Sequence, residues 1–252
     1  MRNLLFQASF NGENFHGWQE QSNARTVQKT IKDAVKQLTG EDVCVTGCSR
    51  TDAGVHANKY YFNFKTESTI PTERFVPALL TKLPPDIVVN NCFDVKGDFN
   101  ARFDCIKKEY KYVIYNGNVP SPFYYKRALW YKYRLDEDLM NKAAKKYIGT
   151  FDFSSFCASG AQVNSKIRTI FDSGVERKGD TVIFTVCGNG FLYNMVRIMA
   201  GTLLFVNENK TDVDSIESII NAKDRKKAGV TLPPDGLYLN NVFYGGDIFE
   251  TI

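Results

Sequence analysis

The sequence has few of the residues on which metal-dependent and disulfide-stabilised proteins rely. Its 252 residues include only two histidines, His16 and His56, too few for a site built from several histidine ligands. The six cysteines form no Cys-x-x-Cys pair, and the spacing of Cys44 and Cys48 suits neither a disulfide framework nor a zinc knuckle. We therefore expect reduced, mostly buried thiols, no bound metal, and chemistry carried by carboxylates.

Long apolar runs are also absent. No segment holds the ~18 consecutive apolar residues that a membrane span requires. The first residues show no charged flank, apolar stretch and cleavage site in succession, so no secretory signal is expected. With 43% hydrophobic and 24% charged residues, the composition is that of an ordinary globular protein, and we expect a cytoplasmic location.

Positive charge is unevenly distributed. Residues 1–105 contain 12 Lys and Arg against 12 Asp and Glu, whereas residues 106–252 contain 20 against 16. Within 106–134, seven basic residues face one acid, Glu109, and nine aromatic residues are interleaved. Cations that neutralise phosphates, mixed with rings on which bases stack, favour a nucleic-acid surface. An exposed pair of strands with Lys on one face and Tyr on the other is an equally good interpretation.

Hydrophobic periodicity predicts the same order of elements twice. In the first half we expect strands at 2–10, 43–49, 60–65 and 87–95, and helices at 27–38, ending at Gly40, and 72–83. In the second half we expect strands at 109–116, 167–177, 181–187 and 237–244, and helices at 136–148, 191–206 and 213–222.

The repeated β-α-β-β-α-β order predicts an α+β fold of two ferredoxin-like, RRM-like halves. The halves are residues 1–105 and 106–252. We expect their sheets to join into one continuous mixed, mainly antiparallel sheet with helices packed on it. The junction near residue 105 would then border a central active-site cleft.

Asp52 is the first candidate for chemistry. It follows a predicted strand, in a turn that Ala53-Gly54 can make tight, with Arg50 two positions before it. A guanidinium nearby favours the charged carboxylate, and an ionised, immobile carboxylate can act as a nucleophile. An Asp that merely caps its own turn is the competing interpretation.

Two further residues stand out in the second half. Arg197 lies in a predicted helix that is apolar on most of its circumference, so burial would require a carboxylate partner, for which Asp52 is a candidate. Pairing with another acid, or extension of the side chain to water, would also satisfy it. Tyr110 shares a strand face with Tyr112 and could stack on an extruded base, or simply pack across the sheet.

The uninterrupted run Arg50-Thr51-Asp52-Ala53-Gly54-Val55-His56-Ala57 resembles the signature of the tRNA pseudouridine synthase A family. The resemblance extends over essentially the whole chain. It continues, in the family's order, at residues 17–19, 26–28, 99–103, 110–116, 194–197 and 236–239.

This resemblance implies isomerisation of uridines 38, 39 and 40 in the anticodon stem-loop of tRNA to pseudouridine, without a cofactor, by a homodimer. Asp52 matches the catalytic aspartate, Arg50 and Arg197 match the arginines around it, and Tyr110 matches the tyrosine that stacks on the target uracil. Substrate contacts are further expected from three basic residues in or beside the matching motifs: Lys108, Lys111 and Arg102.

Some features depart from the family pattern. Cys48-Ser49 stands where Ala-Gly is expected, and Phe10-Asn11-Gly12 where Tyr-Asp-Gly is usual. The unmatched stretch 157–166 is expected to be a substrate-contacting loop. A catalytically silent tRNA-binding protein of the same fold, and a carboxylate-based hydrolase, remain as alternatives.

Overall fold

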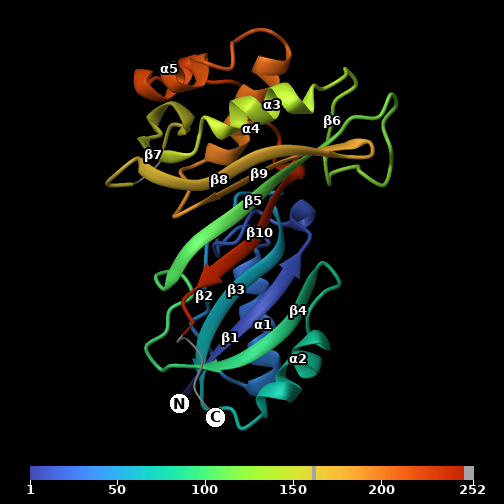
Figure 1. Ribbon diagram of the computed structural model, residues 1–252. Coiled ribbons are helices and arrows are strands. Elements are labelled where there is room, and N and C mark those ends of the chain that lie inside the picture. The colour runs from blue at the N-terminus through green and yellow to red at the C-terminus, as the bar shows by residue number, and fades with distance from the viewer. Residues whose placement is uncertain (161–162, 247–252) are drawn as a thin grey trace. The chain divides into compact units, whose positions relative to one another are not determined.

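The computed structural model describes residues 1–160 and 163–246, which form two compact units (Figure 1). The N-terminal unit consists of Met1–Ile106 together with the C-terminal segment that begins at Leu239. The C-terminal unit is Lys107–Tyr238. Residues 161 and 162, within the loop 157–166 that was expected to contact substrate, lie outside the described residues.

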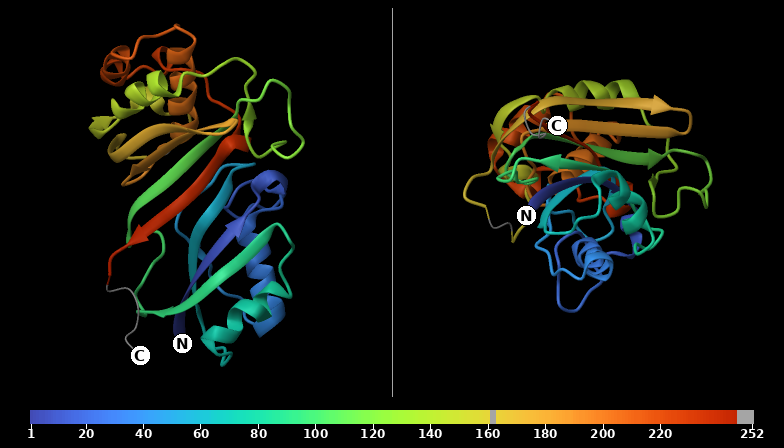
Figure 2. Two further views of the ribbon diagram at one scale, coloured as in Figure 1. Left: turned by 45° about the vertical axis from the view of Figure 1, so that its right-hand side comes forward. Right: turned by 90° about the horizontal axis from the view of Figure 1, so that it is seen from below.

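The N-terminal unit is built from strands with two helices on one face (Figures 1 and 2). Its strands are hydrogen-bonded in the order β4-β1-β3-β10, and β2 pairs with β3. Its elements are β1 (Arg2–Phe10), η1 (Gly12–Asn14), α1 (Val27–Thr39), β2 (Thr46–Gly47), β3 (His56–Thr66), α2 (Thr72–Leu80), β4 (Ile87–Val95) and β10 (Leu237–Tyr244), whose first two residues belong to the other unit.

Aromatic side chains fill the core of the N-terminal unit. β1 runs antiparallel to β3, so Phe6 lies opposite Phe62, and the two rings stack with centroids 5.1 Å apart. Phe64 and Phe75 pack on the same ring, and all four are essentially excluded from solvent. Burying aromatic rings of this size contributes most of the apolar area that stabilises such a core.

The strands of the C-terminal unit are hydrogen-bonded in the order β5-β9-β8-β7, and β6 pairs in parallel with β5. The β5–β9, β9–β8 and β8–β7 pairs are antiparallel. Its elements are β5 (Cys105–Tyr115), whose first two residues belong to the other unit, β6 (Leu129–Trp130), α3 (Glu137–Lys145), β7 (Gly149–Asp152), η2 (Ser154–Phe156), β8 (Ile167–Lys178), β9 (Thr181–Gly188), α4 (Met195–Asn207), α5 (Ser215–Ala222), η3 (Arg225–Lys227) and η4 (Pro234–Gly236).

The predicted α+β class is confirmed, and several elements match their predicted positions. β1, β4 and β10 have the predicted bounds, and α1 ends at Gly40, whose left-handed φ of 78° is the expected stop signal. None of the helices in the described ranges has the length and apolar character that a bilayer span requires. All six cysteines are free; three are buried and Cys44 is exposed.

Other boundaries differ from prediction for local reasons. Helix α4 begins at Met195 instead of residue 191, because Asn194 adopts a left-handed φ of 59° that a helix cannot accommodate. The strand expected at 43–49 is paired only at Thr46–Gly47, and α2 ends at Leu80 rather than 83. The short strands β6 and β7 were not predicted.

Candidate functional site

Asp52 lies in a tight turn between β2 and β3. Its carbonyl oxygen accepts a hydrogen bond from the backbone N–H of Val55, 3.2 Å away, which closes a four-residue turn. Gly54 occupies the third position with a φ of 79°, the left-handed conformation that a type II turn requires there. The predicted Ala53-Gly54 turn is therefore present, and it leaves Asp52 half-buried.

A second loop, residues 12–18, is hydrogen-bonded to this turn on both sides of Asp52. The backbone N–H of Trp18 donates to the carbonyl of Thr51 at 3.1 Å, and that of Gly54 donates to the carbonyl of Phe15 at 3.1 Å. A Cβ atom at Gly12 would overlap the carbonyl of Val55, and one at Gly17 would overlap that of Thr51. Only glycine permits this approach, so the backbone on both sides of Asp52 is fixed.

The departures from the family pattern are accommodated in the same region. Asn11 accepts a hydrogen bond from the backbone N–H of Glu13 at 3.1 Å, the capping contact that an Asp could also make. Cys48 is fully buried, and its Sγ accepts a hydrogen bond from the backbone N–H of Tyr61 at 3.4 Å. Both replacements thus fit the local structure.

Arg50 is exposed, and it forms no ion pair with any other residue of the described ranges 1–160 and 163–246. Its proximity to Asp52 comes from the two-residue separation along the chain. A direct effect of Arg50 on the Asp52 carboxylate stays a prediction.

Arg197 lies in the first turn of α4, where two groups of the C-terminal unit orient its guanidinium. Nε donates to the carbonyl of Leu232 at 2.6 Å, and Nη1 donates to Oδ1 of Asn194 at 2.7 Å. Neither acceptor is charged, so these bonds fix the direction of the guanidinium without neutralising it. The helix around Arg197 is buried, as predicted, whereas Arg197 itself is only half-buried.

Tyr110 and Tyr112 lie on the buried face of β5. The ring of Tyr110 packs edgewise with that of Phe191, with centroids 5.1 Å apart, and only 6% of the residue is exposed. The hydroxyl of Tyr112 donates to the carbonyl of Pro233 at 2.8 Å. Burial raises the pKa of Tyr112, and the nearby charge of Arg197 opposes that rise. The predicted shared face is therefore confirmed, and β5 lies beside the Arg197 region.

The three basic residues expected to bind substrate occupy different places. Lys108 is half-buried on β5, opposite Gly188. Lys111 lies over the ring of Tyr238, with Nζ 5.1 Å from the ring centroid. The pKa of Lys111 is lowered mainly by burial and to a smaller extent by the positive charge of Lys178. Arg102 belongs to the N-terminal unit and is exposed, with its guanidinium over the ring of Phe103.

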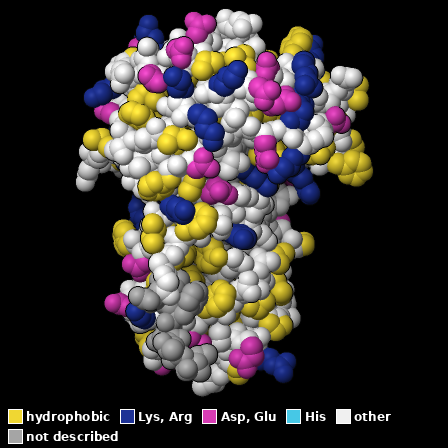
Figure 3. All heavy atoms as spheres, viewed as in Figure 1, with side chains coloured by type: hydrophobic (Ala, Val, Ile, Leu, Met, Phe, Trp, Pro, Cys, Tyr) yellow, Lys and Arg dark blue, Asp and Glu magenta, His cyan; other side chains and the backbone are white. Residues whose placement is uncertain are grey.

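An aromatic and basic surface lies on the segment between β5 and α3, residues 116–135, which projects from the C-terminal unit (Figure 1). Lys and Arg gather there with hydrophobic side chains (Figure 3). Acidic residues are absent from 110–135. The exposed members, which we call the 116–135 surface, are Phe123, Tyr125, Lys126, Arg127, Trp130, Lys132, Tyr133 and Arg134.

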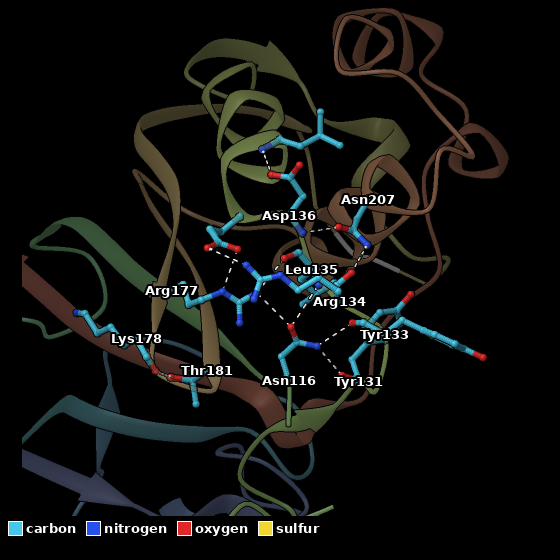
Figure 4. Close-up of polar contacts among 12 residues, drawn as sticks. Asn116, Tyr131, Tyr133, Arg134, Leu135, Asp136, Arg177, Lys178, Thr181 and Asn207 are labelled. Atoms are coloured by element: carbon cyan, nitrogen blue, oxygen red, sulfur yellow. Dashed lines mark hydrogen bonds and ion pairs between the residues drawn. The ribbon is translucent and has the colours of Figure 1, made fainter. Parts of the chain in front are cut away.

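Polar contacts at the base of this surface hold the segment in place (Figure 4). Asn116 Nδ2 donates to the carbonyls of Tyr131 and Tyr133, both at 2.7 Å. Arg177 donates to Asn116 Oδ1 and forms an ion pair with Glu137, with Nε and Oε2 2.9 Å apart. The exposed rings therefore project from an ordered base.

Within the described residues, no group of three or more His, Cys, Asp or Glu side chains could hold a metal ion. The site residues divide between the units: Asp52, Arg50 and Arg102 belong to the N-terminal unit, whereas Tyr110 and Arg197 belong to the C-terminal unit. That the two groups meet stays a prediction.

Comparison with known proteins identifies the family. Residues 7–104 and 143–245 match the family model described as tRNA pseudouridine synthase. The chain belongs to the tRNA pseudouridine synthase family. A tRNA pseudouridine synthase A of Caldicellulosiruptor saccharolyticus is 48% identical over 244 residues, which cover 97% of this chain and 100% of that relative. The proteins of the same name from Acetivibrio thermocellus and Clostridium acetobutylicum are 47% and 44% identical, with the same coverage.

The family predicted from the run 50–57 is thereby confirmed, and with it the isomerase class. Three positions at the site were not predicted from sequence as contributors to it: Gly12, Asn194 and the carbonyl of Leu232. Gly12 and Asn194 lie in stretches that were compared with the family pattern, so that comparison could have indicated them. The main-chain carbonyl of Leu232 has no such signal, because every residue carries one.

Proposed function

We propose that this protein isomerises uridines 38, 39 and 40 in the anticodon stem-loop of tRNA to pseudouridine, with Asp52 as the nucleophile and no cofactor. The family membership supports the reaction class. The observation that carries the assignment of Asp52 is its turn, which is held by hydrogen bonds from the 12–18 loop on both sides. A catalytic carboxylate requires such an immobile backbone.

The reaction needs bond exchange at one sugar carbon. The C1′–N1 bond breaks, the uracil turns within the pocket, and C5 bonds to C1′ while C5 loses a proton and N1 gains one. Asp52 either adds to C1′ or removes the 2′ proton to give a glycal, and each route regenerates the carboxylate. No water or redox equivalent is consumed, and water must be excluded because its attack on C1′ would release the base.

In this proposal the other predicted residues assist Asp52. Arg197, with a guanidinium oriented by two uncharged acceptors, keeps a positive charge that can pair with Asp52 and hold it ionised. Tyr110 lies against the uracil while it turns. Arg50 contributes positive charge to the same loop.

RNA is bound by Lys108, Lys111, Arg102 and the 116–135 surface, whose cations and exposed rings suit phosphates and unpaired bases. In this proposal the protein acts as a homodimer in the cytoplasm, where its tRNA substrate is found.

Asp52→Asn tests the proposal, because it removes the charge with little change of shape. Unmodified tRNA carrying uridine at positions 38–40 is incubated with wild type and variant, and pseudouridine is mapped. We expect product from wild type, none from Asp52→Asn, and unchanged tRNA affinity. Asp33→Asn, on the exposed face of α1, is the matched control and should behave as wild type.

Each other outcome contradicts the proposal in a different way. Product from Asp52→Asn would remove Asp52 as nucleophile. Binding without product in the wild type would indicate a silent tRNA-binding protein. Free uracil in place of pseudouridine would indicate a hydrolase.

A further inference from the structure

The segment that joins α5 to β10, residues 224–232, packs its backbone directly on α4. A Cβ atom at Gly201 would overlap the carbonyl of Val230, and one at Gly229 would overlap the backbone of Gly201. Thr202 Oγ1 accepts a hydrogen bond from the backbone N–H of Gly229 at 2.9 Å. Two glycines and one hydroxyl therefore set the height and the register of the segment on the helix.

Arg225 stabilises the segment through hydrogen bonds to the residues that follow it in the chain. Its guanidinium donates to the carbonyl of Gly229 at 2.8 Å, to that of Ala228 at 3.4 Å and to Oγ1 of Thr231 at 3.0 Å. These acceptors are all uncharged, and Arg225 has no carboxylate partner among the described residues. An arginine placed this way uses its fixed fork of donors to hold backbone rather than to form an ion pair.

The last residue of the segment, Leu232, is hydrogen-bonded to Arg197. The carbonyl of Leu232 accepts from Nε of Arg197 at 2.6 Å, and the backbone N–H of Leu232 donates to the carbonyl of Arg197 at 3.4 Å. One residue further, the carbonyl of Pro233 accepts from the hydroxyl of Tyr112. The position of Leu232 thus helps to set where the Arg197 guanidinium lies, and Arg225 holds the residues immediately before Leu232.

We infer that Arg225 is a positioning residue for Arg197: it fixes the Ala228–Thr231 backbone so that the Leu232 carbonyl aims the Arg197 guanidinium. This inference rests on the proposed function, in which Arg197 acts in the reaction. Arg225 itself contacts no reacting atom. Without the Arg225 guanidinium, the segment would stay attached to α4 through Gly229, but Leu232 would be free to shift.

The test compares Arg225→Gln with Lys226→Gln, each of which removes one positive charge. Lys226 is the exposed neighbour, and it provides the control for a general effect of charge on RNA binding. We expect Arg225→Gln to lower single-turnover pseudouridine formation about 10- to 100-fold, the range expected for a displaced catalytic group, with tRNA affinity unchanged. Lys226→Gln should match wild type. Arg225→Lys should restore only part of the rate, because one ammonium cannot replace the fork.

A double-variant cycle separates positioning from simple support of the fold. If Arg225 acts through Arg197, the Arg225→Gln substitution should have little further effect in an Arg197→Lys background. Equal losses in both backgrounds would overturn the inference. Thr231→Val, which removes one acceptor, is a milder second variant and should lower the rate in the same direction if Arg225→Gln does not fold.

The two proposals can fail separately. If wild type forms pseudouridine and Asp52→Asn does not, but Arg225→Gln retains the full rate, only the inference about Arg225 falls. If wild type forms no pseudouridine, the proposed function falls first.

Discussion

The backbone N–H of Gly12 donates a hydrogen bond to Nδ1 of the buried His56, 3.0 Å away. His56 is therefore an acceptor at Nδ1, and this contact joins the 12–18 loop to the strand that follows the Asp52 turn. Its place in the family signature run has a structural explanation: the imidazole helps to hold the turn that carries Asp52.

The close approach of the two loops predicts the effect of adding a single methyl group. Gly12→Ala and Gly17→Ala should displace the turn and lower pseudouridine formation by about 100-fold, as expected when a reacting group moves by about 1 Å. Gly97→Ala, whose Cβ would meet open space, is the control and should retain the wild-type rate. Wild-type rates in both loop variants would show that the packing around Asp52 is not required.

The left-handed Asn194 predicts different outcomes for two substitutions. Asn194→Gly keeps the backbone conformation but removes the acceptor of Arg197 Nη1, so the rate should fall while the unfolding temperature changes little. Asn194→Ala should also lose about 1 kcal/mol or more of stability, because alanine is strained at a φ of 59°. Single-turnover rates and thermal unfolding measure the two effects separately.

The 116–135 surface predicts a distinct signature in RNA binding. Removing Lys126, Arg127 or Lys132 should reduce the slope of log affinity against log salt by about 0.7–0.9 for each lost phosphate contact. Phe123→Ala and Tyr125→Ala should weaken binding by about 1–3 kcal/mol for each stacked base and leave the slope unchanged. Lys82→Ala, an exposed change in the N-terminal unit, is the control. Unchanged slopes in all three basic variants would contradict this footprint.

The ion pair beneath that surface predicts a pH dependence of stability. The pKa of the Glu137 carboxyl is lowered, most strongly by a hydrogen bond from the backbone N–H of Glu137 and next by the hydrogen bond from Arg177. A lowered carboxyl pKa stabilises the folded state above the ordinary Glu range, and that contribution is lost as the pH falls through the lowered pKa. Wild type should therefore lose more stability than Glu137→Gln between neutral and acidic pH. Parallel unfolding curves against pH would contradict this.

Long, strongly patterned elements could be predicted from sequence, because burial of one face imposes their period. β1, β4 and β10 are apolar-rich strands of eight or nine residues, and α1 has buried residues at helical spacing before its Gly40 stop. β6 and β7 have two and four residues, too few for an alternation to be recognised. Their pairing depends on neighbouring strands that are distant in sequence.

The sequence allowed the candidate site residues to be predicted better than the contacts that those residues make. The tight turn at Asp52 follows from Ala53-Gly54, which are adjacent to it. The support from the 12–18 loop requires a non-local contact, and two of the acceptors of Arg197 are a side-chain amide and a main-chain carbonyl, which were not predicted. Local patterns do not encode such partners, because any backbone position can supply a carbonyl.

The place of β10 has a consequence for how the protein is made. From Leu239 onward this strand belongs to the N-terminal unit and lies beside β3, although in the chain it comes after the C-terminal unit. During synthesis, the part of this edge of β3 that β2 does not pair therefore lacks a partner strand until the C-terminal unit has been translated. The half of the protein that emerges first from the ribosome is the half that is completed last.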